Sequence, residues 1–229
     1  MITLAVAQPR CTALDVPANV AAHAEAVRAA GARVVVFPEL SLTGYHLDAP
    51  VVPFDLLEPL VAACAETGSV ALAGAPVAGP CIGVLEVTGA GVRVAYRKVW
   101  LGGGEPDRFR PGDAPAVVEV DGVRLGLAVC KDTGVPRHAA DTMALGADVY
   151  VASVLEHAHD VGVLDERARR VAADHGVWVA VASFAGGTGE GYGSAAGRSA
   201  VWDPSGAVVV AAGTGVDEVV RAVVPGRAG

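Results

Sequence analysis

Lysine is scarce in this sequence of 229 residues: of 17 basic residues only Lys98 and Lys131 are lysines, and the other 15 are arginines. The sequence contains no block of like charge, and 25 acidic residues bring the formal net charge to −8. Because nucleic-acid binding needs clustered Lys and Arg against phosphates, we expect no DNA or RNA partner. A lysine kept where arginine is the usual cation suggests a specific role, since an ammonium is compact and its pKa can be tuned by burial.

Targeting signals and long apolar runs are also missing. The first ten residues lack the basic start, apolar stretch and cleavage site of a secretory signal, which predicts a cytoplasmic protein. Apolar runs such as residues 177–185 and 207–213 are much shorter than the ~20 residues that span a bilayer. We therefore interpret these runs as buried strands and expect no membrane partner.

Cysteines are few and dispersed, and they form no CxxC pair, which argues against a disulfide framework or a zinc site. His157 and His159 have no third ligand at zinc spacing, so we expect no metal. The glycine-rich segment 186–197 contains a nominal dinucleotide fingerprint without the strand-to-helix setting that it requires. We interpret that segment as a mobile loop and expect no cofactor. The four cysteines are Cys11, Cys64, Cys81 and Cys130.

The length of the chain and its 52% hydrophobic residues predict one domain with a single core over residues 1–229. Short β-branched runs alternate with segments of helical periodicity, which predicts an α/β fold. In the first predicted helix, His23 is expected at the surface. Strands are predicted at 2–8, 33–37, 69–75, 148–153, 177–183 and 218–224, and helices at 17–30, 54–68, 136–145 and 162–175.

The middle of the chain predicts two antiparallel hairpins. Residues 81–87 and 92–98 flank a TGAG turn, while 116–120 and 123–129 flank Asp121-Gly122, a strong hairpin signal. Strands that are apolar along their whole length need cover on both faces. Periodicity leaves open a single doubly wound sheet or two stacked sheets with outer helices, and the hairpins favour the second.

Three polar residues lie where predicted buried strands end. Glu39 follows VVVFP, Lys98 closes VRVAYR, and Cys130 follows RLGLAV. Each residue alone is equally consistent with the start of a solvated loop. Together they fit a catalytic site, because a rigid strand would hold each side chain beside a loop cleft.

The segments around these residues, FPELSLTGY (37–45), YRKVWL (96–101) and GLAVCKDTGVP (126–136), resemble the three ordered signature segments of the nitrilase superfamily, the carbon–nitrogen hydrolases. EPDRFRPG (105–112) and GRSAVWDPSG near the end also match, so the resemblance covers almost the whole chain. It implies a four-layer α-β-β-α sandwich of two mixed sheets with outer helices. It also implies a homodimer or a higher homo-oligomer.

The resemblance further implies a catalytic triad in which Cys130 is the nucleophile, Glu39 the general base and acid, and Lys98 the group that stabilises the tetrahedral intermediate. Glu105 aligns with a second glutamate that orders the lysine, and the backbone N–H of Lys131 would complete the oxyanion site. A nearby ammonium and a following helix start are expected to lower the pKa of Cys130. The implied activity is cofactor-free hydrolysis of a small amide or N-carbamoyl substrate through a thioester, with release of ammonia or an amine.

Two positions depart from the commoner family pattern. Cys130 is followed by Lys131-Asp132 where nitrilases usually carry Trp-Glu, which favours the amidase and carbamoylase side, and Arg137 replaces a frequent glutamate. An alternative is that the chain keeps the fold as a non-catalytic binding or assembly subunit. Glu156 is expected to be a solvated glutamate or, if it faces inward, to pair with a cationic or amino group of the substrate. The predicted pocket residues are Tyr45, Asp132, Thr133, Ser153, Val154 and Glu156.

Overall fold

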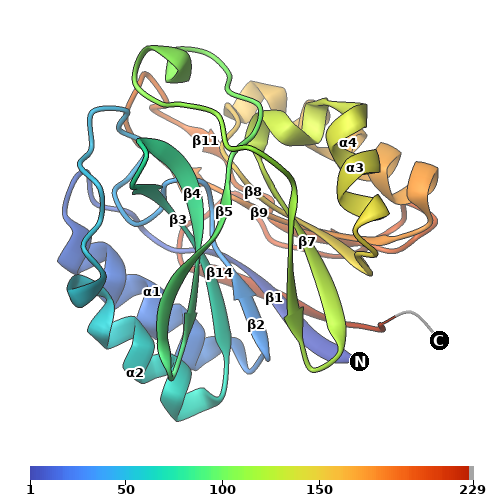
Figure 1. Cartoon of the computed structure of the whole chain (residues 1–229), viewed down its shortest axis with the longest axis horizontal. Helices are drawn as coiled ribbons and strands as arrows, with labels where there is room; N and C mark the ends of the chain where they lie inside the picture. Colours follow the sequence, from blue (N-terminus) through green and yellow to red (C-terminus); the bar gives the residue numbers. More distant parts are fainter. Residues whose placement is uncertain (227–229) are drawn as a thin grey trace.

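The structure, a computed structural model that describes residues 1–226, contains two six-stranded mixed sheets packed face to face (Figure 1). The first sheet consists of β1 (Ile2–Gln8), β2 (Val34–Val36), β3 (Val70–Val77), β4 (Cys81–Thr88), β5 (Gly91–Arg97) and β14 (Glu218–Val224). The second consists of β6 (Ala116–Val120), β7 (Val123–Val129), β8 (Val149–Val154), β9 (Trp178–Ser183), β12 (Ala200–Trp202) and β13 (Val208–Ala211). Their strand orders are β14-β1-β2-β3-β4-β5 and β13-β12-β9-β8-β7-β6.

Helices cover the outer face of each sheet. The pair α1 and α2, blue to cyan in Figure 1, packs on the first sheet, and α3 and α4, yellow to light orange, pack on the second. The predicted α-β-β-α sandwich is thus confirmed over the single-sheet alternative. No helix within residues 1–226 combines the length and apolar character needed to cross a bilayer. The α-helices are α1 (Val16–Ala30), α2 (Glu58–Thr67), α3 (Pro136–Ala144) and α4 (Val161–His175).

Alternation along the strands explains the layering. In β1, Leu4 and Val6 point into the core between the sheets, whereas Ala5 and Ala7 point toward α1 and α2. Successive side chains of a strand face opposite sides, so a strand buried on both faces has a continuously apolar sequence. The alanines on the outer face leave room for helix side chains to pack closely on the sheet.

Both predicted hairpins are present, as β4–β5 and β6–β7. Asp121 and Gly122 have φ values of 50° and 77°, the left-handed geometry of a two-residue hairpin turn. Arg33 donates to Asp121 at 2.8 Å, which ties this turn to the start of β2 in the other sheet.

Two expectations about burial are wrong. The run 207–213 was expected to be a buried strand, but β13 pairs only with β12 at the edge of its sheet and leaves Val208 and Val209 exposed. His23 was expected at the surface but is fully buried, and its two ring nitrogens are satisfied by Asn19 O at 2.7 Å and Ser41 Oγ at 2.8 Å. Burial lowers the pKa of His23 to about 4, so the ring is neutral and braces the segment that follows Glu39.

Candidate active site

Glu39 lies in the turn that follows β2, where the chain passes close to Gly74 within β3. Its side chain is buried, and Leu40 beside it has a φ of 50°. A Cβ at Gly74 of β3 would lie 2.4 Å from Leu40 N and from Pro38 O. Only glycine therefore allows the turn to lie this close to β3, which fixes the position of the carboxylate.

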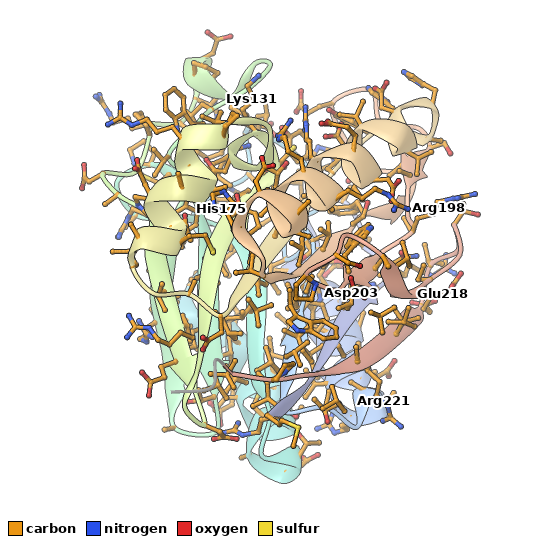
Figure 2. The ribbon with its side chains drawn as sticks, turned by 90° about the vertical axis from the view of Figure 1, so that its right-hand side faces the viewer. Lys131, His175, Arg198, Asp203, Glu218 and Arg221 are labelled. Atoms are coloured by element: carbon orange, nitrogen blue, oxygen red, sulfur yellow. The ribbon has the colours of Figure 1, made fainter. Side chains whose placement is uncertain are left out.

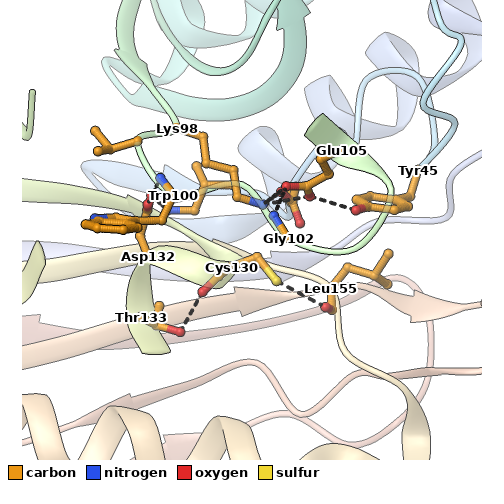
Figure 3. A network of polar contacts seen from close by, with 12 residues as sticks. Tyr45, Lys98, Trp100, Gly102, Glu105, Cys130, Asp132, Thr133 and Leu155 are labelled. Carbon is orange, nitrogen blue, oxygen red and sulfur yellow. Dashed lines mark hydrogen bonds and ion pairs between the residues drawn. The ribbon is translucent and has the colours of Figure 1, made fainter. Parts of the chain in front are cut away.

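Lys98 follows β5 and is the cation at the centre of the site (Figure 3). Its Nζ donates to Glu39 Oε1 at 2.7 Å and to Glu105 Oε1 and Oε2 at 2.7 and 2.8 Å. Burial alone lowers the pKa of an ammonium, but the carboxylates of Glu39 and Glu105 outweigh it and raise the pKa of Lys98. The lysine is thus held as a cation in a fixed position.

Glu105 begins the 3₁₀ helix η2 (Glu105–Asp107) and anchors the lysine from the other side. Besides Lys98, it accepts hydrogen bonds from Tyr45 Oη at 2.7 Å and from Gly102 N at 2.8 Å (Figure 3). A carboxylate with this many donors is held rigidly. Glu105 thereby links the Tyr45 loop to Lys98.

Cys130 is the first residue of the 3₁₀ helix η3 (Cys130–Gly134), directly after β7. It has a φ of 40°, a left-handed conformation that costs a non-glycine residue about 1–3 kcal/mol. Its Sγ lies 3.5 Å from Leu155 O, and Thr133 Oγ1 donates to its carbonyl at 2.7 Å (Figure 3). This sharp turn at the strand end presents the thiol beside Glu39 and Lys98, whose charges both act on it.

The electrostatics of the thiol differ from the expectation. The pKa of Cys130 was expected to fall, but burial raises it, the Glu39 carboxylate raises it further, and Lys98 opposes these effects only in part. Lys98 is less effective because its charge is shared between Glu39 and Glu105. The resting thiol is therefore neutral, and its attack requires a base.

Glu39 has the properties of such a base. Burial raises its pKa to about 8, and Glu105 adds to the rise while Lys98 opposes it. Its Oε1 is bound to Lys98, whereas its buried Oε2 has no hydrogen-bond partner among the described residues. A buried acceptor without a donor is rare and costly, so Oε2 is available for a proton or a ligand.

Asp132, predicted to line the substrate pocket, instead joins the lysine and cysteine segments. It is fully buried and accepts from Trp100 N, Val129 N and Tyr96 Oη, each at 2.8 Å. Tyr96 also bonds His138 Nε2 at 2.8 Å. Because these donors take up both carboxylate oxygens, Asp132 holds the residues on both sides of it in position.

The other predicted pocket residues separate into two groups. Val154 faces α4 because alternation along β8 turns it away from the central core, and with Thr133 it lines a cavity against α4. Ser153, next to it, is buried on the opposite face of β8, and Tyr45 reaches the site through Glu105. Glu156 also lines the cavity, where Arg167 bonds it at 2.8 Å.

The two lysines have opposite environments. The side chain of Lys131 is exposed at the end of the sheets (Figure 2), whereas Lys98 is buried. The backbone N–H of Lys131 belongs to the first turn of η3, where helical N–H groups have no acceptor within the helix. Arg137, the other departure from the family pattern, is exposed and pairs with Asp141 at 3.4 Å, outside the site.

One residue near the site was missed by sequence reasoning. Tyr192 lies in the glycine-rich loop (residues 186–197), where burial and the nearby Cys130, Glu39 and Glu105 raise its pKa. Within this loop, Ala195–Ala196 forms a short strand, β11, which pairs with β10 (Ala185–Gly186). The only feature of the sequence that could have identified Tyr192 is that it is the one aromatic residue in the loop.

A group of possible metal ligands lies beside this loop. His46, Asp48 and Glu190 each offer one ligand atom, and these atoms lie within 4.8 Å of one another. Asp48 and Glu190 are exposed, and Glu190 Oε1 accepts from Leu47 N at 3.1 Å. The group is separate from the buried carboxylates that hold Lys98.

Comparison with known proteins supports one family. A hydrolase from Mycobacterium tuberculosis is 34% identical over 240 residues, covering 92% of this chain and 85% of its own. An (R)-stereoselective amidase from a Pseudomonas species is 38% identical over 65 residues, 28% of this chain and 24% of that protein.

Solved structures share the fold. The amidase from Nesterenkonia sp. AN1 superposes with a TM-score of 0.86 at 23% identity, over 98% of this chain and 93% of that one. Nit3 of Saccharomyces cerevisiae, a member of branch 10 of the nitrilase superfamily, superposes with a TM-score of 0.84 at 23% identity. The match covers 96% of this chain and 89% of Nit3. The carbon-nitrogen hydrolase family model matches residues 3–227, and the chain therefore belongs to this family.

Proposed function

We propose that the protein is an amidase that hydrolyses a small amide or N-carbamoyl compound through a thioester on Cys130. The observation that carries the proposal is the fixed Lys98 ammonium, 2.7 Å from both Glu39 and Glu105, beside a thiol on a strained turn. This arrangement offers a nucleophile, a base with a free carboxylate oxygen and a cation in one buried site.

In the first half-reaction, Glu39 Oε2 takes the proton of the neutral Cys130 thiol as Sγ attacks the carbonyl carbon. Negative charge then develops on the carbonyl oxygen, which Lys98 Nζ and the backbone N–H of Lys131 stabilise. Each such fixed donor is typically worth about 3 kcal/mol of barrier. The C–N bond breaks as Glu39 passes its proton to the nitrogen, so that ammonia or an amine leaves and a thioester remains.

In the second half-reaction, the deprotonated Glu39 takes a proton from water, and the oxygen attacks the thioester carbon. The tetrahedral intermediate uses the same two donors. Its collapse breaks the C–S bond and releases the acid, and Glu39 returns the proton to the Cys130 sulfur. A carboxyl pKa near 8 suits both roles, because a group that donates and accepts protons works best near the operating pH.

The names of similar proteins support this class of reaction. The Nesterenkonia amidase has been solved with butyramide and with acrylamide added at its active-site cysteine. The similar Pseudomonas protein is named as a stereoselective amidase. A small primary amide is accordingly the first substrate class to test.

The test measures ammonia release from primary amides, ω-amides and N-carbamoyl amines. We expect Cys130→Ala, Glu39→Gln and Lys98→Arg each to abolish turnover while the fold is retained, with Cys81→Ala as the matched cysteine control. Rapid quenching and intact-mass measurement should detect an acyl adduct on Cys130 of the active enzyme. Turnover at the wild-type rate in any of the three variants would refute the assignment.

A non-catalytic binding subunit is the competing hypothesis. It predicts that no compound of the panel releases ammonia and that no acyl adduct forms on Cys130. The fixed ammonium between two carboxylates argues against it, because a buried charge cluster of this kind costs stability that a binding role does not require.

A further inference from the structure

A line of hydrogen bonds from four different elements ends at Asp132, beside the turn that carries Cys130. Tyr150 Oη of β8 lies 3.0 Å from His138 Nδ1 of α3, and His138 Nε2 lies 2.8 Å from Tyr96 Oη of β5. Tyr96 Oη donates to Asp132 Oδ2 of η3 at 2.8 Å. We call these four residues the tyrosine–histidine network.

The network is enclosed by protein. Its four side chains are each at most 2% exposed, and each of their polar atoms has a partner. A buried polar group without a partner is costly, because no water replaces the lost hydrogen bond. The hydrogens of the network therefore take the arrangement that satisfies every donor and acceptor.

The partners of Tyr96 determine the direction of the hydrogen bonds. Its hydroxyl has one hydrogen to give and two lone pairs that accept. Val99 N only donates to Tyr96 Oη, at 3.3 Å, and the Asp132 carboxylate only accepts, so the hydrogen of the hydroxyl points to Asp132. The remaining neighbour of this hydroxyl, His138 Nε2, must then be a donor.

This direction sets the tautomer of His138. Since Nε2 donates, Nδ1 has no hydrogen and accepts from the Tyr150 hydroxyl. Burial lowers the pKa of His138, and Asp132 and Asp141 oppose this effect only in part, so the ring is neutral. The opposite direction would need a proton on Asp132, but three N–H and O–H donors on that carboxylate favour its ionised form.

The inner end of the network holds the backbone that follows Lys98. Val99 N, directly after the lysine, binds Tyr96 Oη, and Trp100 N, the next along the chain, binds Asp132 Oδ1 at 2.8 Å (Figure 3). The strand end that carries the ammonium is thus fixed by both inner members of the network.

The same carboxylate holds the backbone that precedes Cys130. Val129 N donates to Asp132 Oδ2 at 2.8 Å. Cys130 itself has a φ of 40°, and a non-glycine residue stays in such a conformation only while its surroundings fix it. A looser Asp132 would therefore let this turn relax and move the thiol relative to Lys98.

We infer that His138 is a positioning residue for the hydrolysis proposed above, and that it acts through Tyr96 and Asp132. The inference rests on that activity. His138 Nε2 is 3.9 Å from Asp132 Oδ2, too far for a direct hydrogen bond, so Tyr96 transmits its effect. The donation from Nε2 keeps the hydrogen of Tyr96 on Asp132, and Tyr150 selects this tautomer by donating to Nδ1.

The tautomer is measured by nuclear magnetic resonance of wild-type protein with isotopically labelled imidazole nitrogens, with the His138 signals assigned through bonds from its backbone. Near neutral pH, we expect a hydrogen on Nε2 and none on Nδ1. A hydrogen on Nδ1 would overturn the inference. Because this measurement needs no variant, it decides the direction of the network even if a substitution prevents folding.

Two substitutions separate the two nitrogens of the ring. The amide of a glutamine reaches the place of Nε2 and can donate to Tyr96, whereas the amide of an asparagine reaches only the place of Nδ1 and can bond Tyr150. Each variant loses one buried hydrogen bond, so both should lower Tm. We expect His138→Gln to keep kcat within about twofold and His138→Asn to lower it by about tenfold, a barrier increase of about 1.4 kcal/mol, with KM unchanged.

Thr142→Val is the matched control. Thr142 is buried one turn further along α3, and its Oγ1 donates to His138 O at 2.7 Å, so the substitution loosens the helix but leaves the ring contacts in place. It should lower Tm without changing kcat. A purely structural role of His138 predicts that kcat does not distinguish its two variants. The inference is overturned if His138→Asn is not slower than His138→Gln.

Alkylation of Cys130 separates this inference from the proposed function. Iodoacetamide reacts with the thiolate, so its rate at Cys130, followed by peptide mass mapping, depends on the positioned site and not on the choice of amide. If the wild type hydrolyses no amide but Cys130 reacts more slowly in His138→Asn than in His138→Gln, the proposed function fails and the positioning stands. If Cys130 does not react more slowly in His138→Asn, the inference is overturned even where amides are hydrolysed.

Discussion

Replacing Glu105 by glutamine tests how strongly the buried charge cluster is held together. The substitution keeps the shape of the side chain but removes the carboxylate that binds Lys98 Nζ at 2.7 and 2.8 Å. Breaking a buried ion pair costs about 3–5 kcal/mol, and we expect about 3 kcal/mol because Lys98 keeps its bond to Glu39. At about 2–4 °C per kcal/mol for a chain of this size, Tm should fall by about 6–12 °C.

The same variant should change catalysis in a way that a purely structural residue would not. Glu105 raises the pKa of Glu39, so its removal should lower that pKa and move the acidic limb of the pH profile to lower pH. At the same time kcat should fall, since Lys98 loses one of its two anchors.

Thermal unfolding followed by circular dichroism and the pH dependence of ammonia release measure these two effects. Glu66→Gln is the control: Glu66 forms an equally close bidentate pair with Arg28, at 2.6 and 3.0 Å, but both side chains are exposed. Exposed pairs contribute little, so its Tm should remain close to that of the wild type. If the two variants unfolded at the same temperature, burial would not be what makes the Glu105 pair strong, and our reasoning would be refuted.

Three further predictions follow from particular contacts. Asp132→Asn places an amide donor against N–H and O–H donors, so kcat and the urea midpoint of unfolding should both fall. Asp141→Asn, at an exposed position, is the control and should change neither value. An unchanged kcat in Asp132→Asn would contradict the positioning role. Because the base form of Glu39 exists above its pKa of about 8, kcat/KM should rise with pH up to that region, and a profile flat from pH 6 to 9 would exclude Glu39 as the base. Gly74→Ala forces a Cβ to 2.4 Å from the backbone of the Glu39 turn and should strongly reduce activity. Gly162→Ala in α4 is the control, because no atom lies within 4 Å of the added Cβ, and its activity should not change. Equal rates of ammonia release by the two variants would disprove the close approach.

Local signals predicted the strands and hairpins, and the four-layer arrangement followed from the resemblance to a known family. Continuous apolar strands such as β1 indicated cover on both faces, and Asp121-Gly122 indicated a hairpin that the structure confirms. The edge strand β13 has the same kind of apolar sequence as a buried strand but pairs on one side only. Its neighbours are set by the order of strands in the sheet, which no local pattern reveals.

The candidate active site was likewise predictable only in part from the sequence. The residue types of Glu39, Lys98 and Cys130 and their places at strand ends were evident from the sequence, and the structure brings these side chains together. Asp132 was assigned to the pocket because it follows Cys130, yet its partners Tyr96 and Trp100 come from the lysine segment. A side chain's role depends on such distant partners.

The sequence by itself determined which chemical groups the protein can use and which strands must be buried, because residue type and periodicity are properties of the chain. Only the tertiary structure decided that the Cys130 thiol is neutral and that Glu39 Oε2 has no hydrogen-bond partner within residues 1–226. The physical reason is that desolvation and Coulomb interactions depend on distances between side chains, and those distances join residues far apart in sequence.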